Sequence, residues 1–187
     1  DRRRLLAEVI QDNHKRKGTL VIPTFSLERS QELLFELDAL LEDDRIPVMP
    51  IFFDSPLAIR LTDVFKQYKS YFNENAQKAI SPGKYLFDFP GLQNTLKSEE
   101  SRMIGNVPNP KIVIAGSGMS TGGRIVHHER HYLPDPNNTL LLTGYQSVGT
   151  PGRLIQEGLK TVHITGEDVA VRAHIVTISG YSGHKDS

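Results

Sequence analysis

The first thing this sequence lacks is cysteine, which appears nowhere in its 187 residues. Disulfide bonds, thiolate metal ligands and cysteine nucleophiles are therefore excluded. The absence also means that cysteine usage gives no indication of the redox compartment.

A net charge is missing as well, because 22 Lys and Arg residues balance 22 Asp and Glu residues. No overall field points to a nucleic acid, although a neutral protein can carry a local basic groove. No apolar run approaches transmembrane length and no signal peptide is visible, so we expect a cytoplasmic protein without a membrane partner. The first residue is Asp1 rather than Met, and we expect a piece of a longer protein.

What the sequence does have is an alternation of short apolar runs with amphipathic helices. Short connections between them predict helices on both faces of a sheet. The expected fold class is α/β, a three-layer Rossmann-like domain with a mostly parallel sheet. Apolar runs rich in β-branched residues predict its strands at 19–23, 47–53, 111–115, 139–143 and 161–165.

Local signals place the helices. Residues 1–17 carry one apolar stripe. Ser26 is a candidate N-cap for a second helix that reaches Glu42, and Ser55 is expected to cap a third over 55–68. Less regular patterns predict helices at 73–80, 98–104, 124–133 and 153–158, a short strand at 85–89, and a strand or hairpin at 168–178.

The string GSGMSTGGR (116–124) stands between a predicted strand and a predicted helix. In parallel sheets ligands bind at the carboxyl ends of strands, where loops 53–55, 115–121 and 143–152 are expected to meet. Glycines before a helix N-terminus suit an anion. The spacing does not fit a dinucleotide-binding G-x-G-x-x-G, and the P-loop lysine is absent. The pattern leaves open a tight turn without any ligand.

The string HHERH (127–131) resembles a metal-binding pattern, with His127 and His131 four residues apart on a helix. It does not match the H-E-x-x-H register, because His128-Glu129 is followed by Tyr132 at the second histidine position. No third ligand suggests itself, so we expect structural or solvated histidines and no bound zinc on this chain.

The other histidines differ in their settings. We expect His14 and His163 to be structural or exposed. His174 alternates with Val176 and Ile178 on one strand face, which favours a packing role. His184 follows a strand in a loop of serine and glycine, where an imidazole has room to reach a ligand.

Five strings in order carry a resemblance to a known family: TLVIPTFSLERSQELL, IFFDSPLA, VIAGSGMSTGGR, LLLTGYQSVGTPGRLIQEG and VRAHIVTISGYSGH. Together they resemble the β-CASP region of the β-CASP metallo-β-lactamase nucleases. That family includes ribonuclease J and the endonuclease subunit of the cleavage and polyadenylation factor, and the prokaryotic RNA-processing members look most similar. The resemblance covers nearly the whole chain and is weakest over 70–109. The chain departs from the pattern at Leu27-Glu28, where a glycine often precedes the arginine matching Arg29.

The resemblance implies an architecture. Residues 1–187 would be the β-CASP (cap) domain, inserted in a metallo-β-lactamase domain whose H-x-H-x-D-H motif binds zinc. Ser182, Gly183 and His184 match the string that closes the insert. The H-x-H-x-D-H motif, the preceding acidic motif and a following V-H-G-E string are absent, so the fragment alone is expected to be inactive, with no cofactor of its own and zinc in the full-length parent.

The resemblance also implies a function, that of an RNA-binding cap in a zinc-dependent RNA phosphodiesterase. His184 would face the scissile phosphate as a proton donor or hydrogen-bond partner. The expected partners are RNA, the metallo-β-lactamase domain of the same chain, and further copies in a homo-oligomer. The residues expected to contact phosphate or RNA are Gly116, Ser117, Gly118, Thr150, Arg153, Ser182 and Gly183. We expect Gly118→Val to weaken RNA binding and leave thermal stability close to wild type.

Two other readings stay open at this point. One is a stand-alone Rossmann-like module that binds a nucleotide or another anion. The other is a catalytically dead relative that works as an RNA-binding subunit. An H-x-H-x-D-H string upstream of Asp1 in the gene would favour the nuclease.

Overall fold

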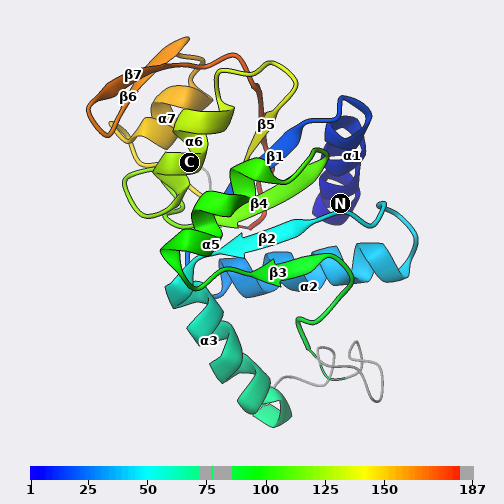
Figure 1. Ribbon diagram of the computed structural model, residues 1–187. Coiled ribbons are helices and arrows are strands. Elements are labelled where there is room, and N and C mark those ends of the chain that lie inside the picture. Colours follow the sequence, from blue (N-terminus) through cyan, green and yellow to red (C-terminus); the bar gives the residue numbers. More distant parts are fainter. Residues whose placement is uncertain (72–76, 78–85, 182–187) are drawn as a thin grey trace.

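A computed structural model describes residues 1–71, 77 and 86–181. Its centre is a six-stranded sheet in the order β3-β2-β4-β1-β5-β8 (Figure 1), and every pairing within it is parallel. The strands are β1 (Thr19–Pro23), β2 (Ile51–Asp54), β3 (Leu92–Asn94), β4 (Lys111–Ala115), β5 (Thr139–Leu142) and β8 (His174–Thr177). The predicted α/β class with a mostly parallel sheet is confirmed.

Helices cover both faces of this sheet, as a three-layer domain requires. Side chains of three helices pack into one core cluster on the first face: α1 (Arg2–Lys15), α2 (Arg29–Glu42) and α3 (Pro56–Gln67). The second cluster holds side chains of α6 (Ile125–Tyr132), α7 (Pro151–Gln156) and the turn after α5 (Ser98–Met103). Two short 3-10 helices lie at Lys69–Tyr71 and Ile104–Asn106.

The central strands alternate between the two cores with a period of two residues. In β1, Leu20 and Ile22 belong to the first cluster and Val21 to the second. In β4, Ile112 and Ile114 face the first cluster, while Val113 faces the second. Both faces are apolar because both are covered by helices, which is why these strands appear in the sequence as continuous hydrophobic runs.

One predicted strand lies in a different sheet. Residues 161–165 were expected in the parallel sheet, but β6 (Thr161–Ile164) pairs antiparallel with β7 (Glu167–Ala170) in a separate two-stranded sheet. Alternate residues of β6 are buried, which is the pattern of a two-stranded sheet that packs one face against a core and exposes the other to solvent. The 168–178 segment therefore divides between β7 and β8, and β8 takes the edge of the main sheet.

Several local predictions were also wrong. Ser26 does not cap α2. The N-cap residue of α2 is Glu28, whose φ is 62°, and no side chain forms a capping hydrogen bond at this helix. Residues 47–50 precede β2 rather than belonging to it. Instead of a strand at 85–89, the described Leu86, Phe87 and Phe89 are buried in a turn, and β3 follows it. Tyr85 and nearly all of the predicted helix 73–80 lie outside the described residues.

Other local signals hold. Ser55 Oγ accepts a hydrogen bond from the Ala58 amide, and Pro56 is the first residue of α3. His163 is exposed beside Asp168, with Nδ1 2.9 Å from a carboxylate oxygen. One expectation about a histidine was wrong: His174, expected to pack, is exposed on β8, which lies at the edge of the main sheet. In the part of the chain that the structure describes, no helix is long and apolar enough to cross a membrane.

The last described residues are tied to the first helix. Tyr181 is 1% exposed, and its hydroxyl donates to a carboxylate oxygen of Glu36. The Arg2 guanidinium lies 4.5 Å above the Tyr181 ring and also donates to the carbonyl of Gly180 at 2.6 Å. Arg2 pairs with Glu36 at 2.7 Å, so a cation, an anion and a phenol fix the end of the described chain against α1 and α2.

Candidate functional site

The carboxyl edge of the sheet brings together the loops that follow β1, β2 and β4. A Cβ placed on Gly116, directly after β4, would lie 3.5 Å from Ser55 Oγ and 3.5 Å from the Thr24 carbonyl oxygen. Thr24 follows β1 and Ser55 follows β2. The predicted meeting of polar loops at this edge is therefore observed, and ligand sites in such sheets lie here.

The glycine-rich loop, residues 116–123, is closed by its own hydrogen bonds. The Ser117 amide donates to the Gly122 carbonyl at 3.1 Å, and the Thr121 amide donates to Ser117 Oγ at 3.1 Å. Gly123 has φ +72°, and a Cβ there would lie 2.4 Å from the Gly116 carbonyl oxygen. Only glycine fits this position, so the loop holds a fixed conformation before α6 begins.

Gly118 faces the protein interior. It is buried, and a Cβ on it would lie 2.7 Å from atoms of the Phe25 ring. A valine at 118 would therefore push against a packed aromatic ring and destabilise the fold. This contact argues against the expectation that Gly118→Val leaves thermal stability close to wild type, and the expectation stays a prediction. The predicted role of Gly118 in phosphate contact stays a prediction, and it concerns the backbone of this residue.

The loop 144–152 is joined to the glycine-rich loop. The Gln146 side-chain amide donates to the carbonyls of Gly118 at 2.9 Å and of Gly144 at 3.1 Å. The Gly152 amide donates to the Met119 carbonyl at 3.3 Å. Sequence reasoning missed Gln146, because a glutamine in a polar loop carries no signal that its side chain is buried. The two loops form one structural unit.

Two predicted contact residues are already engaged within this unit. Thr150 is the N-cap of α7: its Oγ1 accepts from the Arg153 amide at 3.3 Å and donates to the Ser147 carbonyl at 2.7 Å. The Arg153 guanidinium pairs with Glu157 at 2.6 Å. Ser182, Gly183 and His184 lie outside the described residues. Their roles, and those of Thr150 and Arg153, stay predictions.

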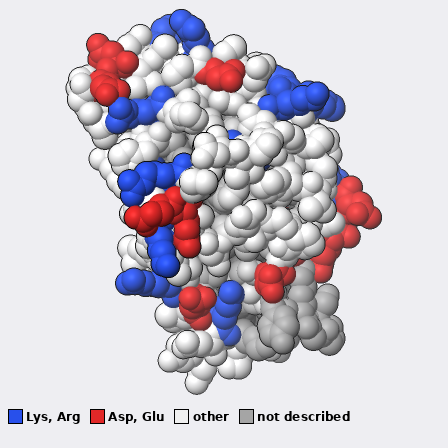
Figure 2. Space-filling model, in the orientation of Figure 1, with Lys and Arg blue, Asp and Glu red and all other residues white. Residues whose placement is uncertain are grey.

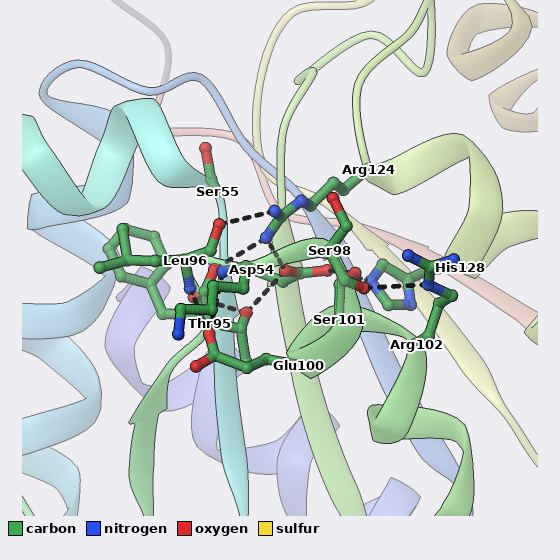
Figure 3. A network of polar contacts seen from close by, with 12 residues as sticks. Asp54, Ser55, Thr95, Leu96, Ser98, Glu100, Ser101, Arg102, Arg124 and His128 are labelled. Carbon is green, nitrogen blue, oxygen red and sulfur yellow. Dashed lines mark hydrogen bonds and ion pairs between the residues drawn. The ribbon is translucent and has the colours of Figure 1, made fainter.

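Beside these loops, Asp54 is the centre of a polar network (Figure 3). Its side chain is fully buried and accepts four hydrogen bonds, each 2.6 Å long, from Thr95 Oγ1, Ser101 Oγ, an Arg124 guanidinium nitrogen and His128 Nε2. Burial alone would raise the pKa of this carboxyl. The donors, His128 first among them, outweigh burial and lower the pKa of Asp54 to about 2. Asp54 is therefore ionised at neutral pH.

Arg124 connects this network to the backbone around it. Besides Asp54, it donates to the carbonyls of Thr95 and Leu96, both at 2.8 Å. It is also the N-cap residue of α6, directly after the glycine-rich loop. The network thus fixes where the loop ends and the helix starts. Sequence reasoning placed Asp54 at the carboxyl edge but missed its partners, which come from distant segments.

A second buried carboxylate, Glu129, is on α6, the helix that also carries His128. It is fully buried, and its Oε1 accepts a hydrogen bond, 2.5 Å long, from Ser120 Oγ in the glycine-rich loop. Its other oxygen, Oε2, is buried and has no partner among the described residues. Burial raises the pKa of Glu129 to about 7, although the Ser120 hydrogen bond opposes the rise.

The three histidines of α6 do not form a metal site. His128 is turned inward to Asp54, whereas His127 and His131 are exposed. Over residues 1–71, 77 and 86–181, no group of three or more His, Asp or Glu side chains is placed to hold a metal. His128 is structural, as expected for this string, and the expectation about bound zinc in solution stays a prediction.

Comparison with known proteins places this arrangement in a family. The profile described as Beta-Casp domain matches residues 30–155, which include the Asp54 network and both loops. The chain belongs to the Beta-Casp domain family. The resemblance seen in the sequence is thereby confirmed.

Three relatives show how this Beta-Casp domain compares along its length. Ribonuclease TTHA0252 of Thermus thermophilus is 40% identical over 95% of this chain and 41% of its own length. Transcription termination factor FttA of Thermococcus kodakarensis is 34% identical over 97% of the chain and 28% of its own length. An RNase J-like protein of Methanocaldococcus jannaschii is 30% identical over 98% and 41%. The chain thus spans well under half the length of these relatives.

Proposed function

We propose that this Beta-Casp domain is the RNA-binding cap of a metal-dependent RNA phosphodiesterase. The observation that carries the proposal is the joined pair of loops at the carboxyl edge of the sheet, in a chain whose relatives include proteins named ribonuclease and RNase J-like. A rigid edge with backbone donors suits a phosphate, because such donors need no rearrangement when the anion binds.

The chain's own residues would bind and orient the RNA backbone. Among the described residues, nothing accepts a hydrogen bond from the amides of Gly118 and Met119. Gly116 and Ser117 stand beside them at the end of β4, and Thr150 and Arg153 on the adjoining loop. Contacts to phosphate position a strand without reading its bases. Ser182 and Gly183 would extend this surface toward His184, which would donate a proton or a hydrogen bond at the reacting phosphate.

The metal of such a phosphodiesterase has no site in the part of the domain described here, because no three suitable ligands meet. We therefore derive no step through a metal on this chain. Zinc held by another region of the same protein, a metallo-β-lactamase domain in our proposal, would supply the Lewis acid. The isolated domain would then bind RNA without hydrolysing it.

The test is single-turnover RNA cleavage by the full-length gene product with metal saturating. We expect His184→Ala to slow cleavage by about 10²-fold or more while RNA affinity and folding stay near wild type. The matched control is His163→Ala, an exposed histidine on β6. A wild-type rate in His184→Ala would remove His184 from the mechanism. A wild-type protein that binds RNA but never cleaves it would instead identify a non-catalytic RNA-binding subunit.

A further inference from the structure

Beside the glycine-rich loop, a groove lies between α5 and α6. Its volume is about 640 Å³, which is within the range of small-molecule sites. The groove is lined by Ser98, Ser101, Arg102, Gly105, Asn106, Arg124, His127, His128, His131 and Tyr132. No Asp or Glu is among these ten lining residues, and five of them are arginine or histidine. On the face of the molecule seen in Figure 2, Lys and Arg side chains are interspersed with Asp and Glu side chains.

The floor of the groove is already occupied by the Asp54 network. Asp54, His128 and Arg124 satisfy one another there, as Figure 3 shows. The negative charge of Asp54 is buried and matched by Arg124, so it does not oppose an anion in the groove above. The Asp54 network therefore fixes the shape of the groove, and an anion would be bound by the side chains on the walls of the groove.

The walls carry donors that have little else to bind. Among the described residues, the imidazoles of His127 and His131 have no hydrogen-bond partner, although His131 packs edge-on against Tyr132 at 4.6 Å. The Arg102 guanidinium donates to the Ser98 carbonyl at 3.3 Å through Nε and pairs with Glu99 at 3.5 Å, and the side chains of that ion pair are about three-quarters exposed. Such exposed pairs contribute little and exchange partners easily. Two histidines and one arginine are thus available to a single ligand.

We propose that this groove binds a phosphate of the RNA strand, as a second contact beyond the 116–123 loop; this rests on the proposed function. The lining offers cationic and hydroxyl donors and no acidic ligand set, which favours an anion and disfavours a metal cation. Arg124 lies at the head of the groove and directly follows the loop. An RNA strand bound at the 116–123 loop would therefore reach the groove without crossing another helix or strand of the protein.

The experiment compares RNA binding by the gene product that carries this domain and by a triple variant, Arg102→Gln, His127→Gln and His131→Gln. The matched control is Arg60→Gln with His163→Gln, which changes exposed residues on α3 and β6. Affinity for a labelled single-stranded RNA is measured by fluorescence anisotropy over a range of salt concentrations. We expect the triple variant to bind about tenfold more weakly and its salt slope to fall by about 0.7 to 1.4, the equivalent of one or two phosphates.

A second measurement separates RNA from free phosphate. Inorganic phosphate is titrated into the wild-type protein while the His127 and His131 resonances are followed by NMR. Shifts in both, together with the weaker RNA binding of the triple variant, support the proposal. Shifts with unchanged RNA affinity would overturn it and leave a site for small anions. Unchanged affinity and slope in a folded triple variant would overturn it as well, whereas a wild-type protein that binds no RNA would refute the proposed function itself.

Discussion

Asp54 and Glu129 are both fully buried carboxylates of this Beta-Casp domain: Asp54 hydrogen-bonds to His128 of α6, and Glu129 is itself on α6. Their surroundings shift their pKa values in opposite directions. Asp54 receives four hydrogen bonds, including one from Arg124, whereas Glu129 receives one from a serine hydroxyl. The pKa of Asp54 falls to about 2, and that of Glu129 rises to about 7. The comparison teaches that donors, not depth, decide whether a buried carboxylate carries its charge.

The difference has opposite consequences for stability as the pH changes. The pKa of Asp54 is lower in the folded than in the unfolded chain, so Asp54 stabilises the fold at pH values above its ordinary pKa of 3.8, and this contribution is lost as the pH falls toward 2. The pKa of Glu129 is higher in the folded chain. Its ionisation therefore opposes folding increasingly as pH rises from 4.5 to about 7. The summed contribution of these two groups is therefore most favourable to folding between pH 3.8 and pH 4.5.

The strongest way to break the comparison is Asp54→Ala. It would leave Arg124 and His128 buried without their anion, and breaking such a pair costs about 3–5 kcal/mol of unfolding free energy. Urea unfolding at pH 7 measures the loss. Asp63→Ala, an exposed aspartate on α3, is the control and should change stability by less than about 0.5 kcal/mol. A loss as small as the control's would mean that the network does not hold the fold together.

The opposite sign is expected at the other carboxylate. Glu129→Gln removes a group that must ionise in the interior at alkaline pH, so it should raise the unfolding free energy by about 1–3 kcal/mol at pH 8. At pH 4, where Glu129 is protonated, the gain should vanish. Unfolding at both pH values measures the difference, with exposed Glu8→Gln as the control. An equal effect at pH 4 and pH 8 would show that ionisation is not the cause.

The smallest expected effects come from single donors. Ser101→Ala removes one of four hydrogen bonds to Asp54 and should cost about 1–2 kcal/mol at pH 7. It should also move the acid-unfolding midpoint to higher pH, because the pKa of Asp54 rises. Ser120→Ala removes the donor to Glu129 and should raise the pKa of that carboxyl further. Acid titrations followed by circular dichroism distinguish the two, and identical profiles would contradict the comparison.

Much of the fold was predictable because its signals are local. The continuous apolar runs at 19–23 and 111–115 became central parallel strands, and Ser55 capped its helix. The strand at 161–165 was assigned to the wrong sheet, because a short run shows that a strand exists and not which partner it takes. The place of β8 at the edge of the main sheet was not predictable for the same reason, and the packing role expected for His174 was therefore wrong.

The candidate site was predictable only in outline. The glycines of 116–123 indicated a special loop, but the need for glycine at 118 comes from Phe25, on the loop after β1. Asp54 gains its donors from Thr95, Ser101 and two residues of the α6 region. Such contacts between distant segments follow no spacing rule, so they become visible only in the folded chain.

The contact between Arg2 and Gly180 joins points that are 178 residues apart in the chain. Tyr181 packs beneath Arg2 as well, so the first and last residues that the structure describes lie close together. The described backbone therefore returns nearly to its starting point. A segment of this kind can be spliced into a surface loop of a host domain while disturbing only the point of insertion. Because these two points lie close together, we expect the fold to tolerate a circular permutation that joins them by a short linker and opens the chain at an exposed turn.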